Sequence, residues 1–290
     1  MDTTPGAVVV AVGGHGTDAA VEFGAGEALR RHRTLHLVHA VDPHDPQAAV
    51  DGSDLLATAV RTASARLGEL GLVTSGLVPG APVAVVTEAS RGADLVVVGR
   101  CPESRRTHPY VRSVTGGIGA RVDTPVVSVP EDWHAPAGGQ ATVVAGVDEP
   151  EKRTDVLEAA FAAARDRQAR LLVLCTSWHP PQTHVTDPSW AQRVEEDLQR
   201  VLEQVGAAYQ DVAVEVHVRN AQAGEALIDA SHRADLVVVG RHNSLLPSGS
   251  HLGPIARAVL READCPVLLA TPRSLHRVRV TAARRLSSAP

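Results

Sequence analysis

A polar segment rich in glycine separates two apolar stretches near the end of the chain. It spans residues 240–255 and reads GRHNSLLPSGSHLGPI. The apolar run before it is typical of a buried strand, and the apolar pattern after it is typical of a helix. Backbone amides in such a loop and the positive dipole end of the following helix can hold phosphate. The segment is therefore a candidate phosphate-binding loop, although its glycines would also suit a sharp turn or a close helix-to-sheet contact.

A carboxylate follows an earlier apolar run. Asp148 ends the stretch VVAGVD, and Glu149 and Glu151 come directly after it. These carboxylates could help to hold Mg²⁺, which prefers oxygen ligands. No Walker-type Lys-Ser/Thr pair follows a glycine loop, so the pattern of a P-loop ATPase is incomplete. Asp148 could equally cap a helix or a turn.

A second glycine motif lies near the start of the chain. Residues 14–19 read GHGTDA, which fits G-x-G-x-x-A, and Asp42 follows the next apolar run. This is the outline of a dinucleotide fingerprint. The equivalent turn at 148–151 has no such glycines. A dinucleotide-binding enzyme is therefore the alternative from a different functional class, together with a weak ATPase in the second half.

Other catalytic and metal motifs are missing from the sequence. No G-x-S-x-G elbow follows an apolar run, and the serines of 248–251 lie inside a loop. His36 and His39 stand three apart on a predicted strand and so point to opposite faces, and no H-E-x-x-H or Cys/His cluster occurs. We expect a protein that is not an enzyme, with no catalytic residues and no protein-bound transition metal.

The chain repeats itself. The octapeptide ADLVVVGR at 93–100 recurs unchanged at 234–241, and DTPVV at 123–127 matches DCPVL at 264–268 in the same register. Such self-similarity indicates a duplicated unit. We call the two units copy one and copy two, and predict domains at 1–137 and 138–273, followed by a basic tail at 274–290.

The apolar runs and helical patterns alternate in each copy. This order predicts β-α-β units and, for each copy, a doubly wound, parallel, five-stranded sheet of Rossmann-like type. In copy one the predicted strands are 8–12, 34–40, 72–78, 94–99 and 125–129, and the predicted helices 18–31, 54–70, 82–91 and 113–121. In copy two the predicted strands are 142–147, 170–175, 212–218, 235–240 and 266–270, and the predicted helices 154–168, 190–205, 223–232 and 254–263. Ligands of such folds collect beyond the carboxyl ends of the strands, where the two candidate loops begin.

Composition limits the classes of partner. Apolar residues make up 44% of the chain and aromatic residues 2%, and the net charge of −5 favours neither nucleic acid nor anionic membrane. The three cysteines form no C-x-x-C pair, and no apolar stretch is long enough to span a bilayer. We expect a cytoplasmic protein with reduced thiols and no membrane partner. The arginine-rich tail lacks aromatic stacking partners, so nucleic-acid binding is not expected of it.

These loops and repeats resemble the universal stress protein family. Its nucleotide-binding members carry Gly-x2-Gly-x9-Gly-Ser after the fourth strand, and copy two keeps that spacing with Gly240, Asn243, Gly253 and Pro254, followed by Ile255. Asn tolerates left-handed backbone geometry, whereas Pro254 lacks the hydroxyl and the amide hydrogen of the family's serine. The family's Asp at the end of the first strand, near the adenosine, is matched by Asp148.

Copy one departs further from the family pattern. Gly13 stands where copy two has Asp148, and the later loop has Pro102 and Arg112 at the second and third glycine positions. The resemblance implies a non-catalytic stress-response protein that binds ATP or a related adenine nucleotide in copy two only; Mg²⁺ on the carboxylates named above is the further cofactor considered. It also implies an intramolecular pseudo-dimer, in which edges 126–129 and 267–270 could pair, and a homodimer as a further assembly. A nucleotide-free interaction module is the remaining alternative.

Overall fold

Strands and helices alternate along the whole described chain. The computed structural model describes residues 4–13, 16–100, 114–136, 138–177, 190–241 and 252–271, so the tail at 274–290 lies outside it. Copy one contains β1 (Val8–Ala11), α1 (Thr17–Arg31), β2 (Leu35–Val41), α2 (Pro46–Leu67), the short 3-10 helix η1 (Gly68–Leu70), β3 (Val73–Pro79), α3 (Pro82–Ala89), β4 (Leu95–Arg100), α4 (Val114–Arg121) and β5 (Val126–Pro130). Copy two contains β6 (Thr142–Val147), the 3-10 helix η3 (Pro150–Lys152), α5 (Thr154–Arg167), β7 (Arg170–Ser177), α6 (Trp190–Gly206), β8 (Val214–Asn220), α7 (Ala223–Ser231), β9 (Leu236–Gly240), α8 (Pro254–Glu262) and β10 (Val267–Ala270).

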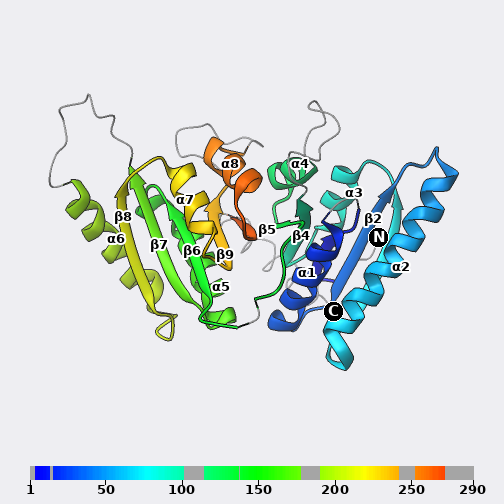
Figure 1. Cartoon of the computed structure of the whole chain (residues 1–290), viewed down its shortest axis with the longest axis horizontal. Coiled ribbons are helices and arrows are strands. Elements are labelled where there is room, and N and C mark those ends of the chain that lie inside the picture. Colours follow the sequence, from blue (N-terminus) through cyan, green and yellow to red (C-terminus); the bar gives the residue numbers. More distant parts are fainter. Residues whose placement is uncertain are drawn as a thin grey trace, which may run out of the picture.

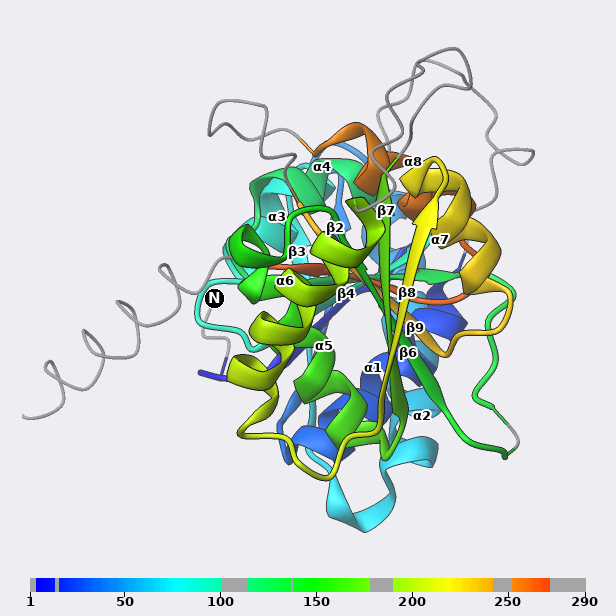
Figure 2. The same cartoon turned by 90° about the vertical axis from the view of Figure 1, so that its left-hand side faces the viewer.

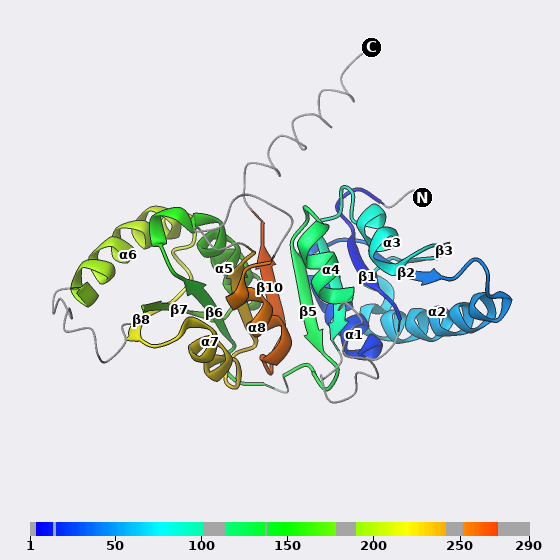
Figure 3. The ribbon, with the colours of Figure 1, turned by 90° about the horizontal axis from the view of Figure 1, so that it is seen from above.

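All the strands belong to one sheet. Its order is β3-β2-β1-β4-β5-β10-β9-β6-β7-β8, and the strands within each copy pair in parallel. β5 and β10 pair antiparallel, with Val267 opposite Ser128 and Leu269 opposite Val126, and they lie side by side at the centre of the molecule (Figure 3). The predicted doubly wound parallel arrangement is confirmed for each copy. The structure adds a central antiparallel junction, which merges the two predicted sheets into one mixed sheet.

Two apolar layers cover the sheet. Helices α1, α2, α5 and α6 share one layer, and α3, α4, α7 and α8 share the other, and both layers contain residues of both copies. Figures 1 and 2 show α4 and α8 together above the junction and α1 and α5 below it. Small side chains allow close packing: a Cβ on Gly24 of α1 would lie 2.4 Å from Val10 of β1. The core therefore continues across the junction on both faces of the sheet.

Helix α2 begins earlier than the predicted range of 54–70. Asp45 caps it by accepting a hydrogen bond from the amide two residues later, and Pro46 takes the first helical position. Gly52 lies inside this helix, where glycine normally disfavours helix formation. A Cβ there would lie 2.6 Å from the ring of His39, so tertiary packing requires glycine at this point. Tertiary packing thus keeps in the helix a residue that signals a break when the sequence is considered alone.

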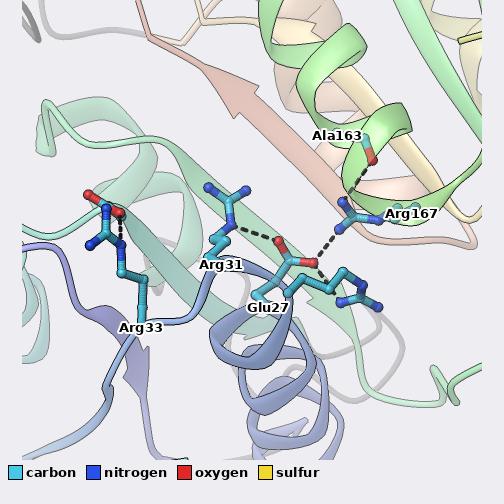
Figure 4. Close-up of polar contacts among 7 residues, drawn as sticks. Glu27, Arg31, Arg33, Ala163 and Arg167 are labelled. Carbon is cyan, nitrogen blue, oxygen red and sulfur yellow. Dashed lines mark hydrogen bonds and ion pairs between the residues drawn. The ribbon is translucent and has the colours of Figure 1, made fainter. Parts of the chain in front are cut away.

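A buried charge cluster joins the copies below the junction (Figure 4). The carboxylate of Glu27 on α1 is 1% exposed and accepts hydrogen bonds from Arg30 Nη1 at 2.9 Å and Arg31 Nε at 3.1 Å. Arg167 of α5, in the other copy, also pairs with it and is 7% exposed. Burial alone would raise the pKa of Glu27, but Arg167, Arg31 and Arg30 together hold it below its ordinary value.

We expect Glu27→Gln to lower the free energy of unfolding by about 3 kcal/mol, because it leaves the buried Arg167 without a compensating charge. Urea unfolding followed by circular dichroism measures this. Glu69→Gln, which removes an exposed carboxylate, is the control and should change stability by less than about 0.5 kcal/mol.

The same variant has a pH signature. Because the folded-state pKa of Glu27 is lowered, its contribution is fully present above the ordinary value of 4.5 and is lost as the pH falls through the folded-state value. The difference in unfolding free energy between wild type and Glu27→Gln should therefore shrink as the pH falls through the folded-state pKa of Glu27. A difference that stays constant with pH would contradict a role for the ionised carboxylate, and so would equal losses of stability in Glu27→Gln and Glu69→Gln at neutral pH.

Candidate functional site

A pocket opens at the carboxyl ends of β6, β7 and β9 in copy two. Its walls combine Asp148, Gly240 and the start of α8 with the apolar side chains of Leu174 and Leu227. In the sheet, β6 lies between β9 and β7. The connection after β6 leads to β7 on one side, and the connection after β9 leads to β10 on the other. Open α/β sheets bind their ligands where two connections diverge in this way.

The pocket brings together the residues that the sequence analysis singled out. Asp148, Gly240, Gly253, Pro254 and Ile255 all line it, although they come from two loops far apart in the sequence. Asn243 lies outside the described residues, as do the neighbouring histidines of the 242–251 segment. The geometry makes a shared site feasible, and their contact with a ligand remains a prediction.

The start of α8 faces the pocket with a mixed set of groups. Gly253 is the N-cap in an extended conformation and makes no side-chain cap, and Pro254 occupies the first helical position. Proline offers no amide hydrogen, so the donors of the first turn that lie at the pocket are the amides of Ile255 and Ala256. The helix end keeps its positive dipole but has lost one donor to an anion.

The carboxylate of Asp148 is paired with an arginine inside the pocket. Its Oδ1 accepts hydrogen bonds from Arg153 Nε at 2.8 Å and from the Glu149 amide at 3.0 Å, and its Oδ2 lies 3.4 Å from Arg153 Nη2. Burial would raise the pKa of Asp148, but the hydrogen bond and charge of Arg153 outweigh it and hold that pKa below its usual value. Asp148 is therefore ionised at neutral pH, with a cation beside it.

Arg153 is the site residue that the sequence analysis missed. Its side chain is 14% exposed, and a Cβ on Gly240 would lie 3.0 Å from its Nη1, so the guanidinium packs over the end of β9. The available signal was its position five residues after Asp148, across one short turn. We considered only the carboxylates of that turn as chemistry, although a cation there bears directly on phosphate binding.

The acidic residues near the pocket are paired with basic side chains. Glu149 pairs with Lys152 at 2.5 Å and Glu151 with Arg200 at 3.4 Å, while Asp148 pairs with Arg153. Within the described ranges, no group of three or more His, Cys, Asp or Glu residues is arranged to hold a metal ion. Binding of Mg²⁺ by these carboxylates therefore stays a prediction.

The chain packs closely against itself at the end of β4 in copy one. Gly16 has a left-handed φ of 78° and its carbonyl oxygen would lie 2.6 Å from a Cβ on Gly99, at the end of β4. The backbone of Arg100 also contacts Gly16, at 3.2 Å from a Cβ there. Close backbone packing therefore accounts for Gly16 of the predicted dinucleotide motif, and Pro102 and Arg112 lie outside the described residues.

The match to known families is extensive. The model of the universal stress protein family matches residues 6–130 and again 141–271. Universal stress protein Rv2005c of Mycobacterium tuberculosis is 29% identical over 91% of this chain and 96% of its own length. Universal stress protein Rv2623 of the same organism is 30% identical over 87% of this chain and 91% of its own length. Both copies therefore contribute to the similarity.

Solved structures agree on the fold. A universal stress protein from Archaeoglobus fulgidus superposes with a TM-score of 0.68 at 15% identity, covering 92% of this chain and 99% of its own. A putative universal stress protein from Pseudomonas aeruginosa gives 0.66 at 17% identity, covering 99% of both chains. In the part of the chain that the structure describes, no helix has the length and apolar character needed to cross a membrane.

Gly99 and Gly240, the equivalent glycines of the two octapeptides, give a matched test of the different packing at the two strand ends. Gly99→Ala should lower the free energy of unfolding by about 1–3 kcal/mol, because the new methyl group meets the backbone of Gly16. Gly240→Ala meets the end of the Arg153 side chain, which can move, and should cost less than about 1 kcal/mol. Denaturant unfolding of both variants decides, and equal costs would show that the two strand ends are packed alike.

Proposed function

The chain belongs to the universal stress protein family as a tandem member, and on that basis we propose that it is a non-catalytic protein that binds ATP or a related adenine nucleotide in copy two. The proposal takes residues 1–137 and 138–273 as the two domains. The observation that carries it is the pocket, where Asp148, Gly240 and Gly253 meet beside the start of α8.

Each part of the pocket suits one part of a nucleotide. Leu174, Leu227 and Val239 supply apolar walls for the base. The ionised carboxylate of Asp148 is an acceptor for ribose hydroxyls, because a carboxylate has more acceptor sites than the hydrogen bonds it already receives here. The phosphates then reach the amides of Ile255 and the dipole of α8.

Arg153 adds a positive charge near the phosphate end. Its guanidinium lies over Gly240, at the pocket. Burial alone would lower the pKa of Arg153, but the hydrogen bond and the charge of Asp148 outweigh burial and raise it, so the side chain is charged at physiological pH. Charge-assisted hydrogen bonds to phosphate are stronger than neutral ones. In our proposal Arg153 compensates for the donor that Pro254 removes from α8.

The described groups of copy two favour binding over catalysis. The carboxylates that could activate water are paired with basic side chains, as shown above. Burial raises the pKa of the Cys175 thiol to about 11 and that of Cys265 to about 12, so neither provides a thiolate nucleophile at neutral pH. A binder acts through the different affinities of its bound and empty states for a partner.

The strand pairing between the copies and the buried thiols support the proposed assembly and location. The antiparallel β5–β10 pairing supports an intramolecular pseudo-dimer, in which each copy covers the sheet edge of the other. Cys175 and Cys265 are buried free thiols, which suit a reducing cytoplasm. Association of two whole chains remains a prediction.

Titration calorimetry with ATP tests the proposed site. Wild type should bind saturably, and Gly253→Arg should weaken binding at least ~30-fold, because the side chain enters the pocket and displaces phosphate from the start of α8. Ala57→Arg adds the same charge at an exposed position of α2 in copy one and should bind like wild type. Native mass spectrometry of the purified protein would identify a retained nucleotide.

Two outcomes would contradict the proposal. Absence of saturable ATP binding by wild type would favour the nucleotide-free interaction module. Equal affinities for wild type and Gly253→Arg would place any nucleotide outside the copy-two pocket.

A further inference from the structure

The repeated octapeptide ends in an arginine that crosses the junction. Arg100 ends β4 and Arg241 directly follows β9, and each residue is only 7% exposed. Both guanidinium groups donate hydrogen bonds to backbone carbonyls of the other copy. The identical residue at equivalent positions thus forms a reciprocal pair of contacts.

Each arginine contacts the carboxyl end of a helix. Arg100 Nη1 donates to the carbonyl of Leu260 at 3.0 Å, and its Nη2 donates to that of Ala263, the C-cap of α8. Arg241 donates through Nη1 to Gly119 at 3.2 Å, in the last turn of α4, and to Val122 just beyond it. A cation at this end of a helix complements the dipole and satisfies carbonyls that lack helical partners.

Arg241 is costly to bury and is held by several acceptors. Burial lowers its pKa to about 10, and the charge of Asp123 offsets this only in part. Besides its bonds to the end of α4, its Nη2 donates to the carbonyl of Thr124 and lies 3.4 Å from Thr271 Oγ1. A buried cation is stabilised by such hydrogen bonds, and here the two Nη atoms of Arg241 make them.

The backbone of Arg241 adjoins two residues that line the copy-two pocket. Gly240, which lines the pocket, is covalently attached to Arg241. Gly253, which also lines it, donates its amide hydrogen to the carbonyl of Arg241 at 2.8 Å. In copy one the corresponding backbone of Arg100 is instead covered by Gly16. Arg241 therefore links two glycines of the pocket to backbone carbonyls of copy one.

We propose that Arg241 is a positioning residue of the copy-two site. Its side chain is anchored at the end of α4 in copy one, and its backbone, which is bonded to Gly240 and hydrogen-bonded to Gly253, holds both glycines in place. Copy one then has a role in binding at copy two, because its carbonyl groups hold the Arg241 guanidinium. Because energetic coupling is reciprocal, ligand in copy two stabilises the contacts of Arg241 across the junction. This inference rests on the proposed function for its ligand, but its structural part does not.

The test compares Arg241→Met with Arg100→Met in the full-length protein. Both variants remove one guanidinium from the junction and keep an apolar side chain of similar length, so both should lower the unfolding free energy to a similar extent. Amide hydrogen exchange of Gly253 is measured without ligand, relative to that of Val144 in the central strand β6. We expect Arg241→Met to speed the Gly253 exchange about tenfold and Arg100→Met to change it less than about threefold.

ATP titration is the second readout. Arg241→Met should weaken ATP binding about tenfold, and Arg100→Met should leave it within about threefold of wild type. Arg241→Lys keeps the charge and can reach some of the same carbonyl acceptors. It should therefore restore part of the Gly253 protection and part of the ATP affinity, and it serves as the test if Arg241→Met does not fold.

The outcomes separate the two proposals. Equal Gly253 exchange in Arg241→Met and Arg100→Met would overturn the positioning role, whether or not ATP binds. Faster exchange in Arg241→Met alone, with no ATP binding by wild type, would support the positioning role and contradict the proposed nucleotide function. Unchanged ATP affinity in Arg241→Met, with binding by wild type, would overturn the link between the contacts of Arg241 with copy one and the ligand.

Discussion

Hydrogen bonding between β5 and β10 brings the two copies into contact, and the other contacts between them depend on it. Each strand would otherwise be the exposed edge of a parallel sheet, where unpaired amides and carbonyls invite association. The antiparallel register, with Leu269 opposite Val126, sets α1 against α5 on one face and α4 near α8 on the other. The Glu27–Arg167 cluster and the two crossing arginines are possible only in that arrangement.

The junction is nearly symmetric, but the strand ends beside it are not. Gly99 and Gly240 occupy the same position of the repeated octapeptide, yet the first is covered by backbone and the second by the side chain of Arg153. The backbone leaves no room for a side chain at Gly99, whereas the Arg153 side chain at Gly240 can shift. Duplication has thus kept one architecture twice, while the packing at the two strand ends differs.

Much of this could be predicted from the sequence, because the informative signals were local. The octapeptides located β4 and β9, and the apolar runs located the other strands to within a few residues. The predicted start of α2 at residue 54 was wrong: the helix begins at Pro46 and contains Gly52, which packs against His39. Arg153 and Arg241 could not be assigned roles, because their partners lie across a turn or in the other copy. The convergence of Asp148, Gly240 and Gly253 was predictable from the fold rule that ligands gather at strand ends.

We propose that copy two binds a nucleotide and that copy one does not. Hydrogen exchange with and without ATP, resolved along the chain, distinguishes the two copies. We expect slower exchange on adding ATP at 146–153 and 253–257, around the copy-two pocket, with little change at the equivalent strand ends of copy one, 11–13 and 98–100. Equal slowing in both copies, or slowing confined to copy one, would contradict it.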